Sequence, residues 1–341
     1  MRPAVPIRLS SFLVNVADLL GLASVDQALL RFETALRRSV MVDDPFLSGI
    51  AGHLISAGGK RLRPSLALAA AATAGTGGLG DAVVQGGVAV ELVHLASLHH
   101  DDVMDEADRR RTVSSVNARW GNLVAVVTGD FLLARAAGIA ASLGSEAASL
   151  LAYTLGRMCE GQVAEVHAMF DPQRPEAAYM TAIAGKTASL TSCACRIGAL
   201  TAGLGNGEQE ALGEFGEAFG LVFQIRDDIL DVVATEDDLG KEAGQDLAKG
   251  IYTLPVLIAL EDPDVGPELR SLLGVPLDQA ARLAARSLVT ESGAIADAVK
   301  EARRWADVAA NAVSSLGRGE AVKALAGLPH ALMDTVPVPA A

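Results

Sequence analysis

Two short acidic motifs are the residues of this chain best suited to chemistry. Residues 101–105 (DDVMD) and 227–231 (DDILD) share the pattern DDxxD. Residues four apart lie on one face of a helix, with Cβ atoms about 5–6 Å apart, so the outer carboxylates of each motif repel unless a cation binds them. Mg²⁺ binds through one or two carboxylates plus water and substrate phosphates. One such motif alone could be a solvated acidic patch, but two after similar apolar helical runs favour a pair of metal sites that hold one diphosphate.

Basic residues elsewhere could bind the phosphates. Residues 58–64 (GGKRLRP) form a glycine turn that leads into a helix, with Pro64 suited to its first turn. Backbone N–H groups and the cations Lys60 and Arg63 would converge there, as phosphate sites require. A solvated basic loop is the plain alternative for this segment alone.

Two further basic segments lie beyond the first acidic motif. An arginine run, residues 109–111, is expected about two helical turns after Asp105. Lys186 belongs to a GKT sequence that looks like the end of a P-loop, but the required earlier glycine is Met180 here, so nucleotide binding by that motif is rejected. Lys186 remains available for a diphosphate.

The elements that position these residues are predicted to be helices. Hydrophobic residues make up 50% of the chain and aromatic residues only 4%, which suits helix packing better than sheet pleats. Apolar residues recur at steps of three or four, and Gly- and Pro-rich breakers separate these segments without a low-complexity linker. We predict an all-α chain with one domain over residues 1–341, a core from about 30 to 328, and a flexible C-terminal tail at 329–341.

Composition also excludes several classes. A net charge of −13 argues against a nucleic-acid surface. Three cysteines without a CxxC pair suit a reducing compartment, so the cytoplasm is expected. The apolar N-terminal stretch carries Arg8 and Asp18, and no membrane span is expected.

The combined motifs resemble the trans-isoprenyl diphosphate synthases of the polyprenyl synthetase family. The resemblance rests on the two DDxxD motifs, GGKRLRP, GKT and residues 244–255 (GQDLAKGIYTLP), and is strongest over residues 43–260. It implies a single-domain helical bundle of the isoprenoid synthase type with a central active-site cavity, and a homodimer. It also implies an alkyl-transferring enzyme, a prenyltransferase that condenses an allylic diphosphate with isopentenyl diphosphate, head to tail and in trans.

The resemblance assigns roles to residues of this chain. Three Mg²⁺ ions per active site would be held by Asp101, Asp102, Asp105, Asp227, Asp228 and Asp231. Isopentenyl diphosphate would be bound by Lys60, Arg63, His94 and Arg111. The allylic diphosphate would be contacted by Arg110, Lys186, Thr187, Gln224 and Lys241. Two departures from the family pattern are Thr112 in place of a glycine and Ile251 in place of a lysine, and the sequence leaves open whether Lys249 substitutes for that lysine.

The helix before Asp101 bears on product length. If Asp101 anchors the diphosphate, the growing chain runs back past Ser97 and Ala96 to Val93. Short-chain synthases resemble one another in placing bulky aromatics four or five residues before the first aspartate, whereas these residues are small. We expect a medium or long product, roughly C30 to C50, with peripheral membrane contact for its release. The alternatives are that the small residues only allow close helix packing and that the enzyme makes farnesyl or geranylgeranyl diphosphate.

Two other functions compete with this interpretation. A class I terpene cyclase shares the fold and an aspartate-rich motif, but usually has an NSE-type second motif where this chain has DDILD. A silent subunit of a heteromeric synthase usually lacks an aspartate motif, whereas both are complete here. A zinc site at His99 and His100 lacks further ligands at zinc spacing, so hydrogen bonding by these residues is the better interpretation.

Overall fold

Helices make up most of the described chain and strands almost none of it, which confirms the predicted all-α class. The computed structural model describes residues 14–75, 79–234 and 243–337, so Lys241 lies outside the described residues. Within these ranges the only strands are β1 (Arg109–Arg110) and β2 (Val113–Ser114), which pair in an antiparallel hairpin. The helices are α1 (Val16–Leu20), α2 (Ala23–Ser39), α3 (Pro45–Ala51), α4 (His53–Ser56), α5 (Leu62–Ala72), α6 (Asp81–Met104), α7 (Val116–Trp120), α8 (Asn122–Leu143), α9 (Ser145–His167), α10 (Glu176–Ile183), the π-helix η1 (Ala184–Ala188), α11 (Ser189–Thr201), α12 (Asn206–Val233), α14 (Gln245–Ala248), α15 (Leu254–Glu261), α16 (Gly266–Leu272), α17 (Gln279–Glu291), α18 (Ala294–Ala312), the 3-10 helix η2 (Ser314–Leu316) and α19 (Glu320–Met333).

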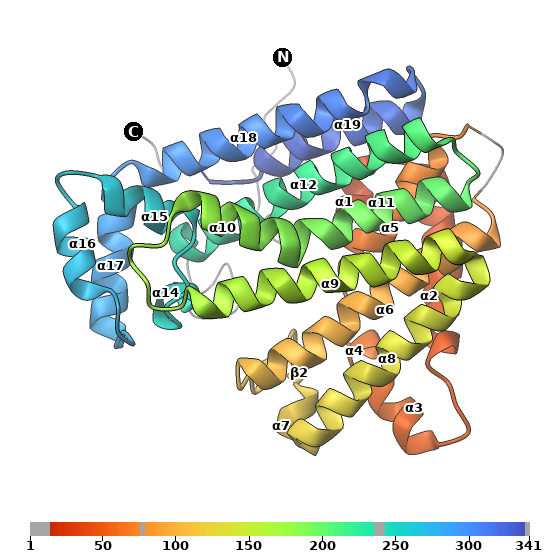
Figure 1. Cartoon of the computed structure of the whole chain (residues 1–341), viewed down its shortest axis with the longest axis horizontal. Helices are drawn as coiled ribbons and strands as arrows, with labels where there is room; N and C mark the ends of the chain where they lie inside the picture. Colours follow the sequence, from red (N-terminus) through yellow and green to blue (C-terminus); the bar gives the residue numbers. More distant parts are fainter. Residues whose placement is uncertain (1–13, 76–78, 235–242, 338–341) are drawn as a thin grey trace, which may run out of the picture.

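The long helices pack side by side around α6 and α12, the two helices that carry the acidic motifs. Helix α6 packs against α2, α5, α8 and α11, and α12 packs against α11 and α18 (Figure 1). Small residues set the closest approaches. A Cβ on Gly198 of α11 would lie 2.0 Å from the carbonyl oxygen of Ala67 in α5, so only glycine fits there.

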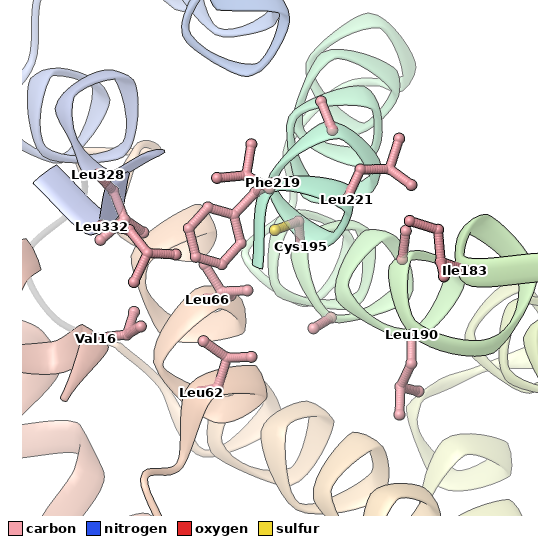
Figure 2. Packing of buried hydrophobic residues seen from close by; sticks show 14 of the residues in the cluster. Val16, Leu62, Leu66, Ile183, Leu190, Cys195, Phe219, Leu221, Leu328 and Leu332 are labelled. Carbon is pink, nitrogen blue, oxygen red and sulfur yellow. The ribbon is translucent and has the colours of Figure 1, made fainter. Parts of the chain in front are cut away.

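One large apolar cluster joins these helices. Figure 2 shows Phe219 of α12 among Leu66 of α5 and Leu328 and Leu332 of α19, with Val16 of α1 close by. Phe219 and Leu66 are 0% exposed. Helices from both ends of the sequence therefore contribute to the same core.

Buried helices extend beyond the predicted limits of the core at both ends. Helix α19 continues through Pro329 to Met333, and Leu332 and Met333 are each 1% exposed. A proline inside a helix costs about 3 kcal/mol, whereas full burial of a large apolar side chain contributes about 1.5–3 kcal/mol, so burial of these two residues offsets it. At the other end, α1 and α2 precede residue 30, and Val16 is buried.

Among the residues that the structure describes, two helices are long and apolar enough to cross a membrane by length and composition, which the sequence prediction did not anticipate. In α6, 72% of the apolar window is buried inside the protein, as in a core helix. In α8 only 33% is buried, and Leu123 and Val127 are 78% and 53% exposed. Helix α8 thus presents an apolar face at the surface of the single chain.

Candidate active site

The two acidic motifs lie at the C-terminal ends of α6 and α12 and meet at one cavity. Asp101 and Asp102 occupy the last turn of α6, and Asp105 caps it. Asp105 and Asp228 line the same cavity of about 140 Å³, which we call the polar cavity. Its lining residues are Asp105, Glu165, Arg174, Tyr179, Ile183, Lys186, Gln224, Asp228, Asp246, Lys249, Ile251 and Thr253.

Several of these carboxylates are held away from water. Burial raises the pKa of Asp101, Asp102 and Asp228 above the usual range for aspartate, although nearby cations and hydrogen bonds oppose this shift. Asp102 accepts a 2.7 Å hydrogen bond from Nε of Arg110 on Oδ1. Its buried Oδ2 has no hydrogen-bond partner among the described residues. Bound positive charge would stabilise the ionised form of these groups.

The donor set suits a magnesium ion that shares its ligands with a substrate. The motifs offer carboxylate oxygens, the ligands that hard divalent cations prefer. Within residues 14–75, 79–234 and 243–337, no three His, Cys, Asp or Glu side chains converge closely enough to form a metal site alone. Mg²⁺ usually keeps several waters and binds one or two carboxylates together with phosphates, so the residues present fit it.

A hydrogen-bonded chain fixes the second motif. Thr187 donates to Oε1 of Gln224 at 2.7 Å, and Gln224 donates to Oδ1 of Asp228 at 2.8 Å. The Tyr179 hydroxyl donates to the other oxygen of Asp228. Gln224 therefore contacts Asp228, four residues on, and its carbonyl end faces Thr187 of the GKT segment.

The GKT segment is a π-helical turn, a geometry often found at functional sites. Helix α9 approaches it very closely: a Cβ on Gly161 would lie 2.3 Å from the backbone nitrogen of Lys186. The Lys186 ammonium forms an ion pair with Glu165, and the nearby carboxylates raise the pKa of Lys186 in spite of its burial. Lys186 lines the polar cavity and also a second, more apolar cavity.

This second cavity, of about 210 Å³, we call the apolar cavity. It runs beside α6, and α8 and α9 form its opposite wall. Its lining residues are Arg63, Val93, His94, Ser97, Leu98, His100, Asp101, Met104, Leu133, Leu155, Met158, Cys159, Gln162, Lys186 and Thr187.

Ser97 and Val93 line the apolar cavity, whereas Ala96 does not. Ala96 is 0% exposed, packs in the main core cluster and is absent from the cavity lining. It precedes Asp101 by five residues, which on an ideal helix is about 140° around the axis from it. In this structure Ala96 therefore packs in the core beside the cavity wall and does not form part of it.

The glycine turn before α5 points its cations in different directions. Arg61, at a left-handed φ of 47°, turns inward and pairs with Glu91 at 2.9 Å and with Glu33. Arg63 instead lines the apolar cavity beside His94, and burial together with the surrounding arginines lowers the pKa of His94 well below its usual value. Lys60 is exposed; partial desolvation lowers its pKa, while the Asp227 carboxylate opposes that shift.

The arginine run lies on a hairpin, so its expected position two helical turns after Asp105 is wrong. Helix α6 ends at Met104, and Arg110 returns in β1 to pair with Asp102. Arg111 sits at the turn with a φ of 58° and packs on Gly59, where a Cβ would lie 2.8 Å from the Arg111 guanidinium. Arg110 thus faces the first acidic motif and Arg111 faces the glycine turn.

Sequence reasoning missed several residues of the two cavities. Tyr179 and Glu165 lie in the polar cavity, as does Arg174 from the loop between α9 and α10. Tyr179 precedes Lys186 by seven residues, two helical turns, which is the one signal that could have identified it. No local pattern marks the residues of α9 that face α6 across the apolar cavity.

Comparison with known proteins agrees with this geometry. The family model described as polyprenyl synthetase matches residues 44–288. The chain is 38% identical over 273 residues to a nonaprenyl diphosphate synthase of Mycobacterium tuberculosis, covering 79% of this chain and 81% of that protein. It is 39% identical over 290 residues to heptaprenyl diphosphate synthase component 2 of Geobacillus stearothermophilus, covering 85% and 90% of the two chains.

Solved structures show the same fold. A polyprenyl synthase from Caulobacter crescentus, crystallised with calcium and isoprenyl diphosphate, has a TM-score of 0.87 at 32% identity and covers 93% of this chain and 97% of its own. A geranylgeranyl pyrophosphate synthase from Corynebacterium glutamicum has a TM-score of 0.81 at 38% identity, with 92% and 96% covered. From its motifs, its fold and these similarities, the chain belongs to the polyprenyl synthetase family.

Proposed function

We propose that this protein is a Mg²⁺-dependent prenyltransferase that extends an allylic diphosphate with isopentenyl diphosphate to a medium or long trans-polyprenyl diphosphate. The observation that supports it best is the position of Lys186. Its ammonium lies where the polar cavity, lined by both acidic motifs, adjoins the apolar cavity beside α6. Such a site can hold a diphosphate at one end and a hydrocarbon at the other.

The reaction needs positive charge near the leaving diphosphate and a site that excludes water, rather than a nucleophilic side chain. The C–O bond to the allylic diphosphate breaks, the double bond of isopentenyl diphosphate attacks the allylic carbon, and the released pyrophosphate takes the proton that is lost. When bound, Mg²⁺ supplies positive charge for the leaving diphosphate. Six carboxylates, at one or two per ion, would serve about three ions.

The chain's own residues position the two substrates. Arg110 holds Asp102, and Lys186 and Gln224 face the leaving group in the polar cavity. Arg63 and His94 line the adjoining apolar cavity together with Asp101, and Arg111 packs on Gly59 of the glycine turn that also carries Lys60, so we place isopentenyl diphosphate beside these residues. A neutral His94 can donate one hydrogen bond to a phosphate without adding charge. Apolar walls keep water from the carbocation.

Product length is the finer part of the proposal. Relatives named for heptaprenyl, octaprenyl and nonaprenyl products support a medium or long chain. Ser97 leaves the cavity open one helical turn from Asp101. The similarity to a geranylgeranyl pyrophosphate synthase favours a C20 product as the second candidate.

Purified protein incubated with Mg²⁺, farnesyl diphosphate and labelled isopentenyl diphosphate tests the function. A synthase consumes isopentenyl diphosphate and forms longer diphosphates. Hydrocarbon release without isopentenyl diphosphate would instead identify a terpene cyclase. Absence of turnover would support a silent subunit; a relative named as one component of a heptaprenyl diphosphate synthase makes a heteromeric assembly worth testing as well.

Matched aspartate variants test the site. Asp101→Ala and Asp227→Ala should each lower turnover by about 100-fold or more, the scale seen when a group that stabilises developing charge is removed. Asp297→Ala, an exposed aspartate in the first turn of α18, is the control and should retain full turnover. Circular dichroism should show all three folded. Near-normal turnover of both active-site variants would refute the metal assignment.

A homodimer is the assembly we propose, in the cytoplasm. Leu123, Val126 and Val127 are exposed on α8, and Tyr153 and Val163 are exposed on α9, which packs against α8. Large exposed apolar side chains on neighbouring helices suit a partner chain. Sedimentation should give twice the chain mass, and Val127→Asp should reduce it to the single-chain mass; a wild-type protein at the single-chain mass would refute the dimer.

A further inference from the structure

We propose that Arg174 and Lys249 bind the diphosphate of the allylic substrate and then the released pyrophosphate, and that Lys249 supplies the positive charge lost with Ile251. This assignment rests on the proposed function for its substrate. Both side chains line the polar cavity between the acidic motifs, yet they come from two loops outside the aspartate helices.

Arg174 is a buried cation with unused hydrogen-bonding capacity. The residue is 7% exposed, and its Nε atom is buried with no hydrogen-bond partner in the described part of the chain. Its guanidinium carbon lies 5.5 Å from the centre of the Tyr179 ring, whose hydroxyl donates to Asp228. A buried guanidinium without a bidentate anion is costly, whereas phosphate oxygens match its donor geometry. Arg174 is therefore directed at an anion beside the second acidic motif.

Lys249 forms a solvent-exposed ion pair with Asp105 of the first acidic motif. Its Nζ lies 2.9 Å from Oδ2 of Asp105, and the two side chains are 38% and 40% exposed. An ion pair this exposed contributes only about 0–1 kcal/mol, so the amine can leave it when a diphosphate arrives. Ile251, two residues on, faces the same cavity and brings no charge.

A backbone hydrogen bond joins the two loops that carry these cations. The backbone N–H of Phe170 donates to the carbonyl oxygen of Gly250 at 2.8 Å. Gly250 has a φ of 72°, and a Cβ there would lie 2.4 Å from Cδ1 of the Phe170 ring. Phe170 and Gly250 are close neighbours in sequence of Arg174 and Lys249, so this contact holds together the two loops that bring both cations to the polar cavity.

This placement predicts selectivity between the two substrates. The cations that line the apolar cavity near the predicted isopentenyl diphosphate site, Arg63 with His94 beside it, are not part of the polar cavity. Loss of Arg174 or Lys249 should therefore weaken binding of the allylic diphosphate and of pyrophosphate, while the KM for isopentenyl diphosphate stays near that of the wild type. A purely structural role for Arg174 would lower stability and affect both substrates alike.

The test measures binding of inorganic pyrophosphate with Mg²⁺ to the full chain by calorimetry, alongside steady-state kinetics. Arg174→Gln and Lys249→Gln should each weaken pyrophosphate binding by about 10- to 100-fold, the range for one charge-assisted hydrogen bond. The control is Arg304→Gln, since Arg304 lies over the Trp305 ring at 4.4 Å on α18, away from both cavities. It should bind pyrophosphate as the wild type does.

A relocated lysine tests the substitution directly. Adding Ile251→Lys to Lys249→Gln should restore most of the lost affinity, because both positions line the same cavity. Failure to restore it in a folded double variant would refute the equivalence of the two positions.

The outcomes separate this assignment from the proposed function. Wild-type affinity in both Gln variants, with the wild-type enzyme active, would overturn the assignment and leave the function standing. A wild-type enzyme that consumes no isopentenyl diphosphate would overturn the function, and the calorimetry would still decide whether Arg174 and Lys249 bind a diphosphate.

Discussion

Replacing Ser97 with phenylalanine should shorten the product, whereas the same change at Ala96 should not. Ser97 lies on the wall of the apolar cavity, one turn of α6 before Asp101. Ala96 packs in the core with 0% exposure. The two neighbouring positions therefore form a matched pair that differs in the direction of the side chain and not in distance along the chain.

The expected size of the effect follows from helix geometry. One turn of a helix rises about 5.4 Å, close to the length of an extended isoprene unit, and Val93 lies about 12 Å along α6 from Asp101. An aromatic ring at Ser97 would close the cavity after about the first turn and remove the space beside Val93. We expect Ser97→Phe to shorten the product by at least the one or two isoprene units, roughly 5–10 Å, that would lie beside and beyond Val93. Ala96→Phe should keep the wild-type product but lose about 1–3 kcal/mol of unfolding free energy through overpacking.

The assay is chromatography of dephosphorylated products from reactions primed with dimethylallyl diphosphate. Denaturant unfolding of each variant measures the stability change. An unchanged product from Ser97→Phe, or a shorter product from Ala96→Phe alone, would refute this description of the cavity wall.

Three further predictions concern stability and reactivity. Glu91→Ala should cost about 1–3 kcal/mol in denaturant unfolding, because it removes one of the two carboxylates that pair with the buried Arg61 guanidinium and leaves only Glu33; an unchanged free energy of unfolding would contradict this. Gly198→Ala should lower the melting temperature, since its Cβ would clash with the α5 backbone, and an unchanged melting temperature would show that the helices can separate there. Alkylation at pH 8 should modify the exposed Cys159 first, with protection by substrate, while burial raises the pKa of Cys193 to about 11 and keeps that thiol protonated. Mass spectrometry of the labelled peptides shows which cysteine reacts first, and modification of Cys193 before Cys159 would contradict this order. Because folding raises the pKa of Cys193, its contribution to stability is complete below about pH 9 and is lost as the pH rises toward 11.

The sequence predicted the helices and the acidic motifs well because both depend on local spacing. Apolar residues that recur every three or four positions define one face of a helix, and the DDxxD motif needs only one helical turn to bring its outer carboxylates together. The core position of Ala96 also agrees with local spacing, since five residues along a helix do not return to the same face.

What the sequence did not predict depends on contacts between distant residues. Helix α6 stops at Met104 partly because the side-chain amide of Asn117 donates to the backbone carbonyls of Asp102, at 3.0 Å, and Ala107, at 3.1 Å. No signal near residue 104 reveals an amide that lies fifteen residues away from Asp102. The place of Arg174 in the polar cavity likewise depends on the contact between Phe170 and Gly250, about eighty positions apart.

The π-helical turn at Ala184–Ala188 also limits which mutations the chain can tolerate there. A π turn holds one residue more than an α turn, so the side chains before and after it are offset by about 100° from an unbroken helix. That offset lets Lys186 and Thr187 face the cavities while Leu190 and Cys193 still face the core. Deleting a single residue there would convert the π turn into a regular α-helical turn. The side chains of α11 would then be rotated by about 100° relative to those of α10 and would no longer face both the cavities and the core. At this turn, tolerance to substitution and tolerance to deletion should therefore differ sharply.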